Sequence, residues 1–159
     1  MRFLRVIRLD ESDRQVYARL AMPGEWAVPG AFAFLAADSD RLEGKRRQAF
    51  RRGFLGTESF GWSTLVEVDE IGDAEYEAVI ERLAAHFVQH YGAPDLDAAR
   101  VMARDEAAFA ASLGTHEVHT LLALERGLDE EGIVENFRVV PPPDGLDHSK
   151  VRFWAVDDG

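Results

Sequence analysis

The chain has 159 residues, of which 47% are hydrophobic and 30% are charged, and its formal net charge is −11 at pH 7. Cysteine is absent, which excludes disulfides, thiol nucleophiles and cysteine-ligated metal sites. No apolar run approaches the roughly 20 residues that span a bilayer, and three arginines interrupt the apolar N-terminus, so no export signal is expected. We therefore expect a cytoplasmic globular protein that does not act at a membrane.

The negative charge is unevenly distributed along the chain. Residues 1–71 carry 11 acidic and 11 basic residues, whereas residues 72–159 carry 18 acidic and 7 basic residues. An acidic half repels phosphate backbones, so no nucleic-acid partner is expected. The same charge suits a basic protein partner.

The first 70 residues predict mainly short strands. Residues 3–9 are largely apolar and residues 16–20 alternate, which predicts an antiparallel hairpin. Residues 26–35 are apolar but contain Pro29-Gly30, which predicts an edge strand, a bulged strand or two short strands. N-capping residues then precede a helix predicted over 41–53. A glycine-containing loop is predicted over 54–62 and a strand over 63–68.

The second half predicts more helix than strand. Apolar residues at helical spacing predict helices over 73–91 and 95–113, and the short link between them predicts an antiparallel helical hairpin. A strand is predicted over 117–125 and a short helix over 129–137. Three prolines at 141–143 separate a globular domain of residues 1–140 from a C-terminal strand or arm in residues 141–159.

These elements predict an α+β fold. The sheet should be antiparallel and should contain the early hairpin together with residues 63–68 and 117–125. The helices, including the helical hairpin, should pack on one face of this sheet.

The helix predicted over 41–53 holds the densest basic cluster, formed by Lys45, Arg46, Arg47, Arg51 and Arg52. Arginine binds phosphate and carboxylate groups in a bidentate manner, so the cluster is a candidate site for an anion or a partner. On a helical wheel, however, most of these side chains diverge over two flanks, which is typical of a solvated amphipathic helix. Arg46 alone falls within the apolar stripe, where it needs a carboxylate partner or a path to solvent.

Three glycines follow this helix at positions 53, 56 and 61. Neither the Lys-Ser/Thr pair of a P-loop nor the GxGxxG fingerprint accompanies them, so they do not indicate a nucleotide site. We interpret them as glycines of a loop that needs positive φ angles. An anion site in this region requires a pocket beside residues 53–61 that is lined by arginines.

His86 and His90 are four residues apart on a predicted helix and share one face. The glutamate of the zinc-protease HExxH pattern is missing, and a three-histidine site can be drawn but is not indicated, so neither a metal nor another cofactor is expected. His90 and Glu106 both fall within apolar helix faces, and a packed Glu106 needs a partner that His90 or Arg46 could supply. We therefore predict a buried polar pair of His90 and Glu106 as one arrangement, with a structural role or an acid–base role.

Four stretches of the chain resemble a small family of uncharacterised bacterial proteins: MRFLRVIRLDESD, PGEWAVPGAFAF, RQAFRRGFLGTESFGWSTLVEV and ERLAAHFVQHYGAPDLDAAR. The resemblance covers most of residues 1–125 and does not include the tail from Pro141 onward. It implies a bacterial, cytosolic, single-domain protein, and it implies no activity and no catalytic residues.

No catalytic signature singles out a nucleophile or an acid–base pair in this chain. We therefore expect a non-catalytic accessory, interaction or regulatory protein that docks on a protein partner through its charged surfaces. The alternative is a small-molecule enzyme or ligand-binding domain that holds an anionic ligand at the basic helix and the following glycine loop.

Overall fold

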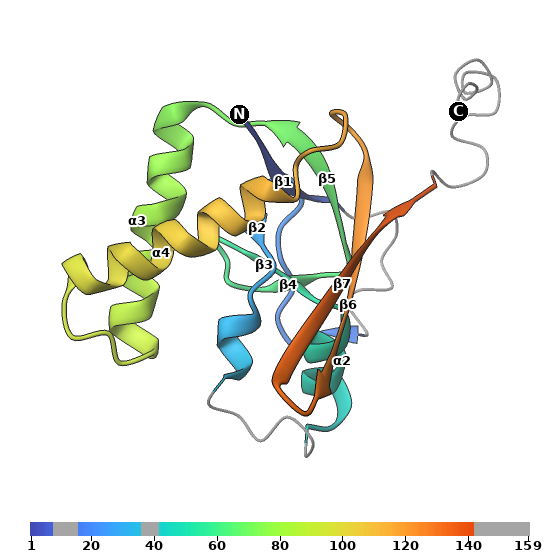
Figure 1. The fold of residues 1–159 in the computed structure, drawn as a ribbon, viewed down its shortest axis with the longest axis horizontal. Coiled ribbons are helices and arrows are strands. Elements are labelled where there is room, and N and C mark those ends of the chain that lie inside the picture. The colour runs from blue at the N-terminus through green and yellow to red at the C-terminus, as the bar shows by residue number, and fades with distance from the viewer. Residues whose placement is uncertain (8–15, 36–41, 142–159) are drawn as a thin grey trace.

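The computed structural model describes residues 1–7, 16–35 and 42–141 (Figure 1). Its strands form one antiparallel sheet in the order β4-β3-β2-β1-β5-β6-β7. The strands are β1 (Arg2–Ile7), β2 (Trp26–Val28), β3 (Phe54–Gly56), β4 (Trp62–Ser63), β5 (Leu65–Glu70), β6 (Leu121–Asp129) and β7 (Gly132–Val140). The helices are the 3-10 helix η1 (Ala31–Phe34) and the α-helices α2 (Gly44–Arg52), α3 (Asp73–His90) and α4 (Leu96–Ser112).

The sheet curls around a core that is centred on β1. This strand pairs with β2 on one side and with β5 on the other, and Phe3, Leu4 and Val6 are almost fully buried, so both of its faces are covered. The rings of Phe137 on β7 and Phe54 on β3 lie 6.2 Å apart, although four strands separate β7 from β3 in the sheet order. Contact between such distant strands requires strong twist and curvature.

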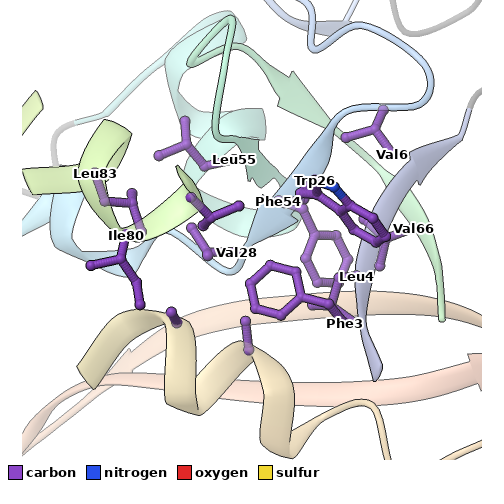
Figure 2. Packing of buried hydrophobic residues seen from close by; sticks show 14 of the residues in the cluster. Phe3, Leu4, Val6, Trp26, Val28, Phe54, Leu55, Val66, Ile80 and Leu83 are labelled. Atoms are coloured by element: carbon purple, nitrogen blue, oxygen red, sulfur yellow. The ribbon is translucent and has the colours of Figure 1, made fainter. Parts of the chain in front are cut away.

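Helices α3 and α4 form the predicted helical hairpin and cover one side of the sheet (Figure 1). Arg100 of α4 pairs with Glu81 of α3 at 2.8 Å, and Arg104, one turn further along α4, pairs with the earlier Glu77 at 2.9 Å. The two helices therefore run antiparallel. The buried face of α4 is built from alanines, which let the helix backbone approach its neighbours closely. Figure 2 shows Ile80 and Leu83 of α3 beside Val28 of β2 in the same apolar cluster. The α+β class, the antiparallel sheet and the helical hairpin are thus confirmed.

The prediction of a hairpin between residues 3–9 and 16–20 is wrong. The neighbours of β1 are β2 and β5, and Leu20 instead forms an isolated parallel bridge with Trp62. The apolar residues of this segment serve another purpose, because Tyr17 is buried in a second apolar cluster with Phe34 and Phe50. Residues 26–35 form one short internal strand, β2, followed by η1, so the stretch is neither an edge strand nor two short strands.

The loop predicted over residues 54–62 contains β3 and β4. Its glycines do not adopt positive φ angles, and they serve close packing instead. A Cβ atom on Gly56 would lie 2.4 Å from the Glu25 carboxyl group, and one on Gly61 would lie 2.3 Å from the backbone of Leu20. The interpretation of these glycines as positive-φ residues is therefore wrong.

The short helix predicted over 129–137 is also wrong, because these residues form the turn of the β6–β7 hairpin and most of β7. Glu135 and Phe137 are partly buried, whereas Val134, Asn136 and Arg138 are exposed, which is the two-residue period of a strand. The helix predicted over 41–53 corresponds to α2, and residue 41 lies outside the described residues. So does the predicted arm from residue 142 onward.

Arg126 ties the β6–β7 hairpin to the rest of the fold. It is 2% exposed, and its Nε lies 2.9 Å from a Glu135 carboxylate oxygen. Its Nη1 donates to the carbonyl of Phe50 at 2.8 Å, and its Nη2 donates to the carbonyl of Pro29 at 2.7 Å. Burial lowers the pKa of Arg126 and Glu135 opposes this effect, and an arginine remains protonated in proteins. The buried charge thus joins β6 to the C-terminal end of α2 and to the start of η1.

Arg126→Met should destabilise the protein by about 3 kcal/mol or more, because it leaves Glu135 and several backbone carbonyls without their donor in a buried site. Urea denaturation at pH 7 measures this change. Arg104→Met is the matched control, since it removes an exposed ion pair of α4 and should leave the unfolding midpoint unchanged. Equal midpoints for the two variants would contradict the structural role of Arg126.

Candidate functional site

A cleft of about 330 Å³ opens between α3 and the loop of residues 57–61, which joins β3 to β4. One face of α3 forms one wall, and Arg19 and the 57–61 loop form the other; the lining residues are Arg82, Ala85, His86, Gln89, His90, Arg19, Glu58 and Phe60. The volume falls at the lower end of small-molecule sites. A pocket lined by arginines therefore lies beside residues 53–61, although these arginines do not come from the basic helix.

His86 is held in an aromatic setting on the floor of the cleft. Its ring stacks on the ring of Phe60, with centroids 3.7 Å apart and planes 4° from parallel, and the ring of His90 lies 4.9 Å away. Phe60 adopts a φ of 54°, a left-handed conformation that is costly for a bulky side chain. Such a conformation persists only where the surrounding structure enforces it. The backbone of the loop therefore fixes the position in which Phe60 stacks on His86.

Burial, together with the positive charges of His90 and Arg19, lowers the pKa of His86 to about 4. His86 is therefore neutral at physiological pH. Burial is the largest cause of this lowering, because it disfavours the charged imidazolium, and the neighbouring His90 and Arg19 add smaller contributions.

The 57–61 loop is held by the buried carboxylate of Glu25, which is 5% exposed. One oxygen accepts hydrogen bonds from the backbone N–H groups of Glu58 at 2.8 Å and Ser59 at 2.9 Å. The other accepts from the Ser59 hydroxyl and from the backbone N–H of Met22, each at 2.6 Å. Sequence reasoning missed this residue; its only signal was an acid directly before the apolar segment that begins at Trp26.

The basic cluster of α2 does not contribute to the cleft. Lys45, Arg46, Arg47 and Arg52 are exposed, and Arg51 lies 3.7 Å from the Glu125 carboxylate. Of the two arrangements expected for Arg46, a carboxylate partner or a path to solvent, the structure shows the second: Arg46 is exposed, and its guanidinium lies 5.2 Å from the centre of the Phe34 ring in a cation–π contact. The structure therefore disperses the five basic residues that the sequence suggested as an anion site.

His90 and Glu106 do not form the predicted buried pair. His90 is exposed and lines the cleft beside His86. Glu106 does not line the cleft, and its carboxylate accepts a hydrogen bond from the backbone N–H of Gly30 at 3.2 Å. Burial raises the pKa of Glu106. The helical wheel placed both side chains on the buried face of their helices. This is correct for Glu106 and wrong for His90, which lines a cleft and not the core.

The described residues contain no group of three or more His, Cys, Asp or Glu side chains placed to hold a metal ion. None of the helices in residues 1–7, 16–35 and 42–141 is long and apolar enough to cross a bilayer.

The stability of the protein should fall as the pH falls from about 6.5 to about 4, in part because of His86. Its folded-state pKa lies below its ordinary value of 6.5, so over this window the unfolded chain binds the proton more readily than the folded protein. His86→Gln should reduce the difference between the urea midpoints at pH 7 and pH 5. The exposed His116→Gln should leave that difference unchanged, and an unchanged difference in His86→Gln would contradict a buried, neutral imidazole.

The chain was compared with protein families, curated proteins and solved structures. No curated protein and no solved structure matches it. Residues 1–154 match the model of a family of unknown function, which confirms the resemblance to an uncharacterised family. Since this match covers nearly the whole sequence, the chain belongs to the family of unknown function DUF6505.

Proposed function

We propose that this protein is a non-catalytic binding module that holds a small anionic ligand in the cleft between α3 and the 57–61 loop. The observation that carries this proposal is a concave site that is lined by two arginines from separate parts of the chain. Arg82 comes from α3 and Arg19 from the opposite wall, and His90 and Gln89 add further hydrogen-bond donors. The sequence suggested an anionic ligand at a different set of arginines.

Arg82 is available to a ligand. Among the described residues it has no carboxylate partner, whereas the two arginines that α4 presents to α3 are both paired with glutamates. Arg19 uses one N–H in a long hydrogen bond of 3.4 Å to the carbonyl of Ser59. Both guanidinium groups therefore retain most of their donors for an incoming carboxylate or phosphate.

Two features of the cleft oppose an anion. Glu58 contributes one negative charge, and the C-terminal end of α3 contributes a partial charge of about −0.5. The two guanidinium charges exceed this sum, so the cleft keeps a positive potential. Phe60 and Ala85 add apolar surface, which suits a ligand with a small apolar portion.

Thermal-shift and calorimetric screening with phosphate monoesters, nucleotides, acyl-CoAs and small carboxylates tests this proposal. Arg82→Ala should weaken the affinity for any ligand found by ~10-fold or more, because it removes charge-assisted hydrogen bonds. The control is the double substitution Arg47→Ala and Arg52→Ala on α2, which should leave the affinity unchanged. Loss of binding in the α2 variant alone would locate the site at the basic helix, and no binding across the panel would contradict the proposal.

A protein partner is the second candidate function, and the exposed edge of β7 favours it. β7 is the last strand of the described sheet, and its apolar Val134 and Val139 are 38% and 50% exposed. An edge strand of this kind can accept a further strand from a partner. Under this second proposal, the protein has the expected accessory role in the cytoplasm of a bacterium.

Capture from native lysate at low salt, followed by identification of the bound protein, tests the second candidate. Val134→Lys should reduce capture because a lysine on an edge strand opposes pairing, whereas Arg82→Ala should capture the partner normally. A chain that stays monomeric and alone under these conditions would count against a protein partner.

A further inference from the structure

We propose that Glu25 is the positioning residue of the cleft: its buried carboxylate organises the 57–61 loop and thereby places Phe60 against His86. The consequence for ligand binding rests on the proposed function. The geometric role of Glu25 follows from its hydrogen bonds and does not depend on the identity of any ligand.

The Glu25 carboxylate acts as an internal anion for the loop. Consecutive backbone N–H groups of Glu58 and Ser59 donate to one of its oxygens, as in the backbone nests that bind free anions. The Ser59 hydroxyl and the Met22 N–H donate to the other oxygen. Four donors offset the cost of burying the charge, and removal of the carboxylate would leave all four without their acceptor.

The absence of a side chain at Gly56 makes this arrangement possible. A Cβ atom at this position would lie within 2.7 Å of both carboxylate oxygens of Glu25. No real Cβ contact is this short, so any other residue here would displace the carboxylate. Glu25 and Gly56 thus form one packing unit, although they are distant in sequence.

The bonds to Glu25 determine the position of Phe60. Glu58 and Ser59 precede Phe60, and the Ser59 hydroxyl also accepts a hydrogen bond from the N–H of Gly61 at 3.0 Å. The backbone is therefore held on both sides of Phe60, which accounts for its left-handed φ. Held in this way, the Phe60 ring covers the His86 ring and removes it from water.

His86 reports whether Phe60 is in place. The groups that face its ring are His90 and Tyr91 from α3 and the residue after it, Phe32 from η1, and Phe60 and Arg19 from the opposite wall. Glu58 also lines the cleft. Phe60 and Glu58 belong to the loop that Glu25 holds, and Arg19 donates a hydrogen bond to the carbonyl of Ser59 in the same loop. A change at Glu25 therefore reaches the imidazole through this loop.

The experiment is an NMR titration of the His86 ring in the full chain. In the native protein the ring should titrate near pH 4. In Glu25→Ala the released loop should expose the ring and shift its titration upward by about one pH unit or more, toward the value of a solvated histidine. Acetate added at high concentration should occupy the vacated nest and move the titration back down, whereas chloride at equal ionic strength should not.

Two further variants keep the test decisive. Glu25→Gln, which retains the size of the side chain but loses the charge, should give a smaller upward shift and serves if Glu25→Ala does not fold. Phe60→Ala should shift the titration upward without any response to acetate. Glu117→Gln, at an exposed acid outside the cleft, should titrate as the native protein does.

A His86 titration that stays near pH 4 in both Glu25 variants overturns the positioning role. A folded Glu25→Ala protein whose shifted titration ignores acetate overturns it as well, because the carboxylate is then not the group that orders the loop. Because this titration needs no ligand, its failure leaves anion binding untouched. A failure of the ligand panel refutes the proposed function alone.

Discussion

The fold depends on a buried guanidinium that binds backbone carbonyls of two separate segments and the side-chain carboxylate of a third. Arg126 on β6 donates to the carbonyls of Phe50 at the end of α2 and of Pro29 before η1, and it pairs with Glu135 on β7. Helix ends and turns carry carbonyl groups that no regular structure satisfies. A single planar donor with a fixed positive charge satisfies several of them at once, which a neutral side chain cannot do. The β6–β7 hairpin and α2 meet at this point.

Glu25 performs the complementary task at the other end of β2. Arg126 is a buried cation that binds carbonyl groups, and Glu25 is a buried anion that binds N–H groups of the 57–61 loop. Each side chain forms hydrogen bonds with backbone groups that lie outside regular sheet or helix pairing. In an exposed segment, water would make these hydrogen bonds. The cleft lies directly beside the segment that Glu25 orders, so its shape follows from the packing of the sheet rather than from a flexible surface loop.

The distribution of arginines changes the functional interpretation. The dense cluster of α2 is dispersed over a solvated surface, where one member pairs with Glu125 and another lies over Phe34. The two arginines of the cleft stand alone in the sequence and meet only in the folded protein. Local density of charge is therefore a poor guide to a binding site here, because a site requires convergence of donors and a helix presents successive residues in diverging directions.

The amino-acid sequence alone determined the features that depend on local periodicity. The apolar stripes of α3 and α4 and their short link predicted the helical hairpin, and the apolar residues of 3–9 and 63–68 predicted strands that correspond to β1 and β5. Composition likewise excluded thiol chemistry. The family resemblance was also carried by the sequence, and the comparison confirmed it.

Only the tertiary structure decided which segments become neighbours. The carbonyl of Pro29 is 97 residues from Arg126, and the Ser59 hydroxyl is 34 residues from Glu25. Glycines 56 and 61 are required by close contacts with such distant segments and not by their own backbone angles. Periodicity reports that a side chain faces inward, but it does not report what that side chain meets. The partners of Glu25 and Arg126, and the position of Arg19 and Arg82 in the lining of one cleft, are long-range consequences of the tertiary fold.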